Sequence, residues 1–197
     1  MSNYMPGATA VGIAYNGGVI LAAEKRISYG TFVVSKKGRK VFKISDKVGA
    51  ACAGLIGDMQ ILMREISSYV KIREIETRRS LPPNSVAKLL SVIMFERRFA
   101  PYITQIVIGG VNGDSSVYVL DPLGSVIPDK YAAVGSGAEM AIGVIDLEYN
   151  ADMNEAAAKK LAIKSIKSAI QRDSASGDGV DLMVITSSGI TEESINF

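Results

Sequence analysis

The sequence predicts an α+β fold in which two antiparallel sheets pack face to face and two pairs of helices cover their outer faces. Three observations point to this arrangement. Strand-like apolar runs come in groups joined by tight turns, which favours antiparallel pairing over alternating strands and helices. Two pairs of helical segments separate these groups. The 197 residues contain no repeat, low-complexity tract or linker, so we expect a single domain over residues 8–197.

The first two strands are predicted by a hairpin signal. The apolar runs Val11–Tyr15 and Val19–Ala23 flank Asn16 and Gly17. Asn-Gly between such runs favours a tight hairpin turn, because both residues tolerate a positive φ angle. We therefore expect these two runs to pair directly with each other.

Three further strands are predicted before the first helix. We expect a second hairpin, formed by residues 32–35 and 41–44 around the basic turn Lys36–Lys40. A fifth strand is expected at residues 48–53, which are nearly all small. Small side chains in a strand indicate that another backbone or layer approaches closely there.

Helices are predicted where apolar residues recur at helical spacing. The first is expected over residues 58–76. The second begins with a cap at Asn84 or Ser85 and ends before Ala100 and Pro101. The remaining expected elements are strands at 103–109, 117–120, 131–134 and 180–186 and helices at 138–148 and 154–172.

Composition excludes several classes of function. The formal net charge is +2, with acidic and basic residues interleaved, so we expect no nucleic-acid partner. The chain has no histidine, which excludes a Ser-His-Asp triad and a histidine-ligated metal, and its single cysteine, Cys52, excludes an internal disulfide. No apolar run approaches the ~20 residues of a membrane span. The first seven residues lack the features of a secretory signal, so we expect a cytoplasmic protein without membrane contact.

A set of short motifs keeps a consistent mutual spacing along the chain. The set comprises Gly7-Ala8-Thr9-Ala10-Val11-Gly12-Ile13, Glu24-Lys25-Arg26, Lys40, Gly54-Leu55-Ile56-Gly57-Asp58, Gly135-Ser136-Gly137, and Asp173 with Ser176. In this joint register the chain resembles a proteasome β subunit of archaeal type, from Ala8 to near the C-terminus. The resemblance implies the four-layer αββα sandwich of the N-terminal nucleophile hydrolases. It also implies threonine-type endopeptidase chemistry, which requires no metal or cofactor.

The resemblance further implies roles for individual residues. In this family a threonine freed by removal of a propeptide attacks the substrate, and its own α-amine, with a pKa near about 8, is the base. Lys40 would lower the pKa of the hydroxyl and the amine, and Glu24 would hold Lys40 in place. The amine and a bound water would be oriented by Ser136, Asp173 and Ser176.

Two further parts of the site are implied in the same way. The backbone N–H near Gly54 would stabilise the oxyanion of the tetrahedral intermediate, and glycine would let the substrate carbonyl come close. A pocket beside the scissile bond would favour apolar side chains. Its expected residues are Ile27, Gly38, Cys52 and Ile56.

The sequence departs from the family at the nucleophile. Ala8 stands where the family has threonine, and alanine has no oxygen with which to attack the bond after Gly7 or a substrate. Thr9 follows, but adjacent strand residues point to opposite faces. We therefore expect Thr9 to face away from Lys40 unless the strand slips. The propeptide-like segment is residues 1–7, or residues 1–8 if cleavage frees Thr9.

Three explanations of Ala8 remain. The chain is a natural non-catalytic β subunit that shares a ring with an active paralogue, an engineered variant of an active subunit, or a subunit that is cleaved after Ala8 and uses Thr9 as nucleophile. Ala10 also replaces a threonine that is usual in the family. This second difference argues against a single engineered change.

The resemblance implies partners. It predicts stacked seven-membered rings of proteasome α subunits and other β subunits, an unfolding ATPase that acts indirectly, and unfolded polypeptide substrates. An α subunit is disfavoured because no N-terminal extension precedes the first strand. The bacterial proteasome-like ATP-dependent protease is disfavoured because it opens almost at once with its threonine and lacks the Gly177-Asp178-Gly179 motif. A generic α+β binding module would explain the elements but not the joint register.

Overall fold

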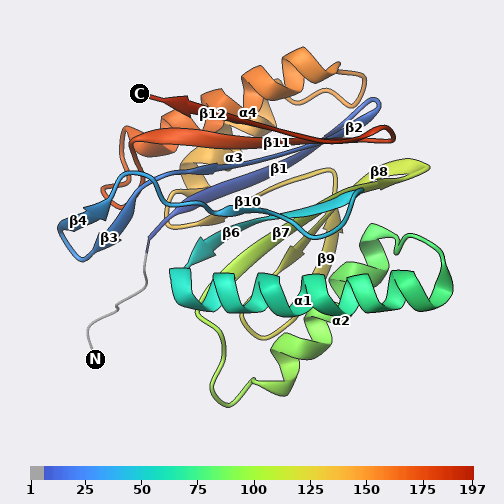
Figure 1. Cartoon of the computed structure of the whole chain (residues 1–197). Helices are drawn as coiled ribbons and strands as arrows, with labels where there is room; N and C mark the ends of the chain where they lie inside the picture. Colours follow the sequence, from blue (N-terminus) through green and yellow to red (C-terminus); the bar gives the residue numbers. More distant parts are fainter. Residues whose placement is uncertain (1–6) are drawn as a thin grey trace.

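The computed structural model describes residues 7–197 and confirms the predicted fold class. Two five-stranded antiparallel sheets lie face to face, and a pair of helices covers the outer face of each (Figure 1). Of the expected propeptide-like segment, residues 1–6 lie outside the described residues. The first sheet has the order β10-β1-β2-β11-β12. Its strands are β1 (Thr9–Tyr15), β2 (Gly18–Glu24), β10 (Tyr131–Gly135), β11 (Gly179–Thr186) and β12 (Gly189–Asn196).

The second sheet has the order β5-β6-β7-β8-β9. Its strands are β5 (Val41–Lys43), β6 (Val48–Gly54), β7 (Thr104–Asn112), β8 (Asp114–Leu120) and β9 (Val126–Asp129). The helices are α1 (Ile56–Thr77), α2 (Pro83–Glu96), α3 (Ala138–Glu148) and α4 (Glu155–Ile170). In Figure 1, α4 lies above the first sheet and α3 behind its strands, whereas α1 and α2 lie below the second sheet.

Three apolar interfaces hold the four layers together. Strand β1 shows how they are built, since all seven of its residues are buried. Val11 and Ile13 pack with α3 and α4, whereas Ala10 and Ala14 pack between the two sheets. Strand residues alternate between faces, so one strand serves two interfaces. The third interface joins the second sheet to α1 and α2.

The small residues of β6 mark a close approach between layers, as predicted. A Cβ atom added to Gly49 would overlap the sulfur of Met183 on β11. Ala51 and Ala53 belong to the same cluster between the sheets. The close spacing of the two sheets therefore depends on small side chains along this strand.

The predicted second hairpin is wrong. Strand β4 (Phe32–Ser35) pairs with β3 (Ile27–Tyr29) in a separate two-stranded sheet, and β5 pairs with β6. The basic turn therefore carries the chain from this small sheet to the second main sheet. Residues 27–29 gave no strand signal because they form a three-residue strand that is at most half-buried.

Other boundaries also differ from the predictions. Helix α2 begins at Pro83 and its capping residue is Pro82, not Asn84 or Ser85; proline is well suited to a first helical turn because it lacks an N–H. Strands β9 and β12 were not predicted, because their side chains are mostly exposed and lack an apolar pattern. Within residues 7–197, no helix is both long and apolar enough to cross a membrane.

Candidate active site

The site is built around the point where the chain enters β1. Ala8 is fully buried, and its methyl group belongs to the cluster between the sheets. Its backbone N–H donates to Ser136 Oγ over 3.1 Å, and its carbonyl accepts from the N–H of Gly137 over 3.4 Å. The nucleophile position of the predicted register is thus held from both sides, but its side chain carries no oxygen.

Thr9 lies next to this position with its hydroxyl already engaged. The side chain is fully buried, and its Oγ1 is 2.7 Å from Ser176 Oγ. A Cβ added to Gly137 would overlap the same Oγ1, so the hydroxyl is enclosed between the start of α3 and the loop after α4. In this conformation the hydroxyl of Thr9 cannot reach a substrate.

Asp173 joins the serines into one hydrogen-bond network. Its Oδ2 accepts from Ser136 Oγ over 2.6 Å and from Ser176 Oγ over 2.7 Å. Its Oδ1 accepts from the N–H of Ala175 over 3.1 Å, which shapes the loop. The predicted trio of Ser136, Asp173 and Ser176 is therefore brought together. It holds the backbone N–H of Ala8 at one end and the hydroxyl of Thr9 at the other.

Lys40 and Glu24 form a buried ion pair on the other side of the entry point. Lys40 Nζ donates to Glu24 Oε1 and to the backbone carbonyl of Arg26. Glu24 Oε2 accepts from the N–H groups of Arg26 (2.7 Å) and Gly177 (3.1 Å). Burial lowers the pKa of Lys40 and raises the pKa of Glu24, while their mutual attraction opposes both shifts. The lysine is therefore easier to deprotonate than one in water.

A surface clamp supports this loop, and the sequence analysis did not identify it. Arg26 donates from Nε to Asp178 Oδ2 over 2.8 Å and from a terminal nitrogen to the carbonyl of Ser174 over 3.0 Å. Hydrogen bonding to Arg26 holds the pKa of Asp178 below its ordinary value. The sequence signals were the Glu24-Lys25-Arg26 and Gly177-Asp178-Gly179 motifs, and a side chain on Gly177 would overlap the Arg26 guanidinium.

Glycine is required at Gly135, where β10 meets Ala8. The φ angle is +97°, and an added Cβ would overlap the Ala8 carbonyl and lie 2.7 Å from Ala53 Cβ. We expect Gly135→Ala to lower the free energy of unfolding by more than the ~1–3 kcal/mol of positive-φ strain alone. Gly113→Ala is the matched control, since Gly113 has φ +80° and an added Cβ there would meet open space. Equal losses for the two variants in urea unfolding would show that the contact with Ala8 does not constrain the site.

A small pocket of mixed character, lined by Arg26 and Lys40 as well as apolar residues, lies beside Gly7. It encloses about 20 Å³, and Ile27, Ile56 and Gly54 are among its lining residues. Gly38 lies directly behind Ile27, because a Cβ there would contact the Ile27 side chain. Ile27, Gly38 and Ile56 are thus grouped where the sequence predicted a specificity pocket.

Cys52, the fourth residue expected in this pocket, does not line it. Its side chain points to the opposite face of β6, is fully buried, and belongs to the cluster against which Ile56 packs. Burial raises the pKa of the thiol well above its ordinary value. Cys52 is therefore an unreactive core residue.

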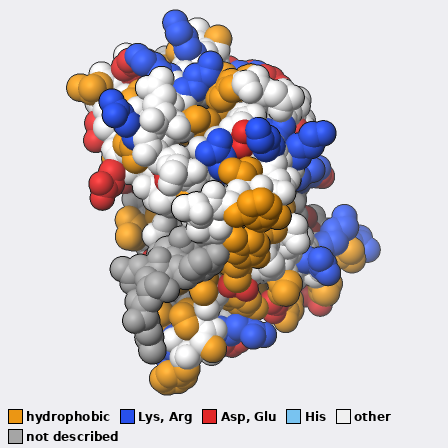
Figure 2. All heavy atoms as spheres, turned by 90° about the vertical axis from the view of Figure 1, so that its left-hand side faces the viewer, with side chains coloured by type: hydrophobic (Ala, Val, Ile, Leu, Met, Phe, Trp, Pro, Cys, Tyr) orange, Lys and Arg blue, Asp and Glu red, His pale blue; other side chains and the backbone are white. Residues whose placement is uncertain are grey.

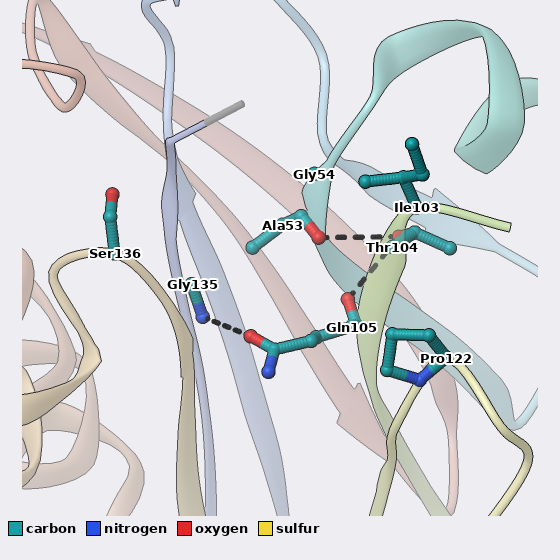
Figure 3. A pocket seen from close by; sticks show the side chains of 8 residues that line it. All are labelled: Ala53, Gly54, Ile103, Thr104, Gln105, Pro122, Gly135 and Ser136. Atoms are coloured by element: carbon teal, nitrogen blue, oxygen red, sulfur yellow. Dashed lines mark hydrogen bonds between the residues drawn. The ribbon is translucent and has the colours of Figure 1, made fainter. Parts of the chain in front are cut away.

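A second cavity, of about 180 Å³, opens on the other side of Gly54 (Figure 3). Gln105 lies in its wall and accepts a hydrogen bond from the N–H of Gly135 over 2.8 Å. The sequence analysis did not single out Gln105, since one polar residue in a strand carries no motif. Residues 7–197 contain no cluster of three or more side chains that could hold a metal ion.

Comparison with known proteins gives a consistent result. A family model described as proteasome subunit matches residues 5–185. Proteasome subunit beta 1 of Cenarchaeum symbiosum is 58% identical over 95% of this chain and 97% of that protein. Proteasome subunit beta 1 of Nitrosopumilus maritimus is 56% identical over 98% and 97%. Proteasome subunit beta 2 of Pyrobaculum arsenaticum is 52% identical over 96% and 94%. The similarity therefore spans nearly the full length of all three.

Proposed function

We propose that this chain is a non-catalytic β subunit of the core particle. The premise is that the chain belongs to the proteasome subunit family and resembles its archaeal β subunits. In this role it forms part of the wall of the chamber in which unfolded proteins are degraded. An active β paralogue supplies the threonine-type endopeptidase chemistry.

One observation carries the proposal: the nucleophile position holds a buried methyl group within an otherwise assembled site. The N–H of Ala8 is bound by Ser136, and Lys40 is paired with Glu24. A hydroxyl nucleophile and a free α-amine on one residue are the two groups that the chemistry needs. Ala8 supplies no hydroxyl, and no substrate bond can be attacked from this position.

The alternative is that cleavage after Ala8 turns Thr9 into the nucleophile. In its favour, the Thr9 hydroxyl already contacts Ser176, which in turn donates to Asp173. Against it, the hydroxyl is buried on the side of α4, away from the pocket lined by Lys40. Thr9 would have to move by one strand position, with loss of the Ser136 and Gly137 contacts to Ala8.

Assembly with other subunits is supported by exposed apolar surface. The β3–β4 hairpin lies on the face shown in Figure 2, where apolar side chains gather in one patch. Tyr29, Phe32 and Val34 of this hairpin are all about half or more exposed. Contiguous apolar surface of this kind is typical of faces covered in an assembly. We propose α subunits and other β subunits in seven-membered rings as neighbours, an unfolding ATPase that acts indirectly, and a cytoplasmic location.

A peptide epoxyketone tests the proposal, because its double addition needs a hydroxyl and a free amine on the same terminal residue. In an assembled particle we expect no adduct on this chain and an adduct on the active β subunit, read by intact mass. The active subunit is the internal control for reagent and assembly. An adduct on a form of this chain that begins at Thr9 would establish the alternative instead.

A further inference from the structure

We infer that an open groove at the far end of β1 from Ala8 binds a small zwitterion of about dipeptide size. The ammonium group of this ligand pairs with Asp114, and its carboxylate pairs with Lys130. The groove has a volume of about 440 Å³, within the ≈ 300–1,000 Å³ typical of small-molecule sites. Binding there is independent of whether this subunit cuts peptides.

Turns from both sheets converge on this groove. The β1–β2 turn contributes Asn16 and Gly17, the β7–β8 turn contributes Gly113, and the β11–β12 turn contributes Ser187. In Figure 1 these three turns lie together on the right, at the end of the sandwich opposite the N-terminus and the β3–β4 hairpin. Loops held in place by a rigid scaffold are common locations of binding sites. The sandwich therefore fixes the walls of the groove.

The floor of the groove is apolar and well packed. Ala14, Tyr15 and Val111 line it, and each of them is less than a tenth exposed. Tyr149, half-buried beside them, donates its hydroxyl to the carbonyl of Ala14 over 3.1 Å and packs its ring against Tyr131. This floor suits a ligand with an apolar body.

Two groups of opposite charge line the groove without partners. Asp114 begins β8 in the second sheet, whereas Lys130 directly precedes β10 in the first, where its carbonyl accepts from the N–H of Ala14 over 2.8 Å. Within the part of the chain that the structure describes, neither charged side chain forms an ion pair or a hydrogen bond. The hydroxyls of Ser115 and Ser187 also have no partner among these residues.

The two charges select the chemistry of the ligand. A ligand with a single charge pairs with one of the two groups and is repelled by the other, and a neutral ligand pairs with neither. A zwitterion pairs with both, and the two serine hydroxyls add hydrogen bonds. Because Asp114 and Lys130 are exposed, each pair contributes only about threefold to fivefold in affinity. We therefore expect binding in the millimolar range.

Titration calorimetry on the purified full-length subunit at low salt tests the inference. The probes are leucyl-leucine, N-acetyl-leucyl-leucine, which lacks the ammonium group, and leucyl-leucinamide, which lacks the carboxylate. We expect leucyl-leucine to bind about threefold to fivefold more tightly than either blocked form, as for loss of one solvent-exposed ion pair.

Variants of the two charged residues assign each pair. Asp114→Asn should weaken leucyl-leucine to the level of its acetylated form and leave the acetylated form no weaker. Lys130→Met should do the same with respect to the amide. Ala151→Trp, at the rim of the groove, should block all three probes. Glu96→Gln and Lys88→Met are the matched controls, since both residues are exposed and lie outside the groove.

Three results would overturn the inference. They are no binding of leucyl-leucine up to about 10 mM, equal affinity for the three probes, and binding that Ala151→Trp leaves intact. Asp114 and Lys130 are exposed and unpaired, so their variants should keep the melting temperature of the parent. A matched melting temperature shows that any loss of binding arises in the groove and not from unfolding.

Discussion

Ala8→Thr is expected to turn this subunit into a self-processing peptidase. The variant adds a hydroxyl at a position whose N–H is held by Ser136 and which lies beside the pocket lined by Lys40. We expect cleavage of the bond after Gly7 in the assembled particle, which frees the α-amine as base. Peptide hydrolysis by this subunit should rise by on the order of 10⁴ or more, the scale seen when a nucleophile is removed or restored. Intact mass and hydrolysis of a fluorogenic peptide measure the two effects.

The controls separate the hydroxyl from the change in shape. Ala8→Val has nearly the shape of threonine without the oxygen, so it should remain uncleaved. Lys40→Met combined with Ala8→Thr should keep the hydroxyl but lose most of the gained activity. If Ala8→Thr assembles into particles but leaves residues 1–7 attached, the site lacks more than a nucleophile.

Lys40→Met is expected to destabilise the subunit strongly. The variant keeps the apolar stem but leaves Glu24 fully buried with one oxygen unpaired. Breaking a buried ion pair from one side costs about 3–5 kcal/mol, or a fall in melting temperature of roughly 6–20 °C for a chain of this size. Urea unfolding and thermal unfolding of the purified subunit measure both.

The loss of stability in Lys40→Met should depend on pH in a definite direction. Burial already raises the pKa of Glu24, and loss of Lys40 removes the contact that opposes this shift. A carboxyl with a raised pKa in the folded state is favoured at low pH, and that advantage is lost as the pH rises through the folded-state pKa. The deficit of Lys40→Met should therefore be smaller near about pH 5 than near about pH 8.

A second variant shows whether charge is the cause. Glu24→Gln in the Lys40→Met background removes the buried charge and keeps an oxygen for the N–H groups of Arg26 and Gly177. The double variant should recover most of the stability that Lys40→Met loses, and the remaining deficit should not depend on pH. If the double variant is as unstable as Lys40→Met alone, lost packing and not the unpaired charge is responsible.

The layers of the fold could be predicted because their signals are local. The hairpin of β1 and β2 rests on Asn16 and Gly17, and the turn pairs Tyr15 with Gly18. The pairing of β4 could not be predicted in this way. The basic stretch after β4 predicts a turn into a hairpin with β5, but β4 pairs with the preceding strand β3. Nothing in the local sequence distinguishes pairing with β3 from pairing with β5. Exposed edge strands such as β12 lack the apolar alternation that reveals a strand.

Most residues of the site could be predicted from the sequence, but not all of the contacts that they make. Ser136, Asp173 and Ser176 lie far apart in sequence, and their register suggested that they meet, which the distances in the structure now show. Which face a strand side chain points to depends on its place in the alternation along the strand, and the sequence did not fix this for β6. Cys52 was therefore expected in a pocket, but its side chain faces away from it. Gln105 and Arg26 act through one or two side-chain contacts with residues far away in the sequence. Such contacts leave no pattern in one sequence.

The intact mass of this subunit, taken from a purified assembled core particle, tests the central claim most directly. We predict a mass that still includes Met1 or Ser2, because Ala8 cannot cleave the bond before it. A chain that begins at Thr9 would contradict this account. It would show that β1 slips by one residue and that the Thr9 hydroxyl, buried against Ser176 in this structure, becomes a working nucleophile.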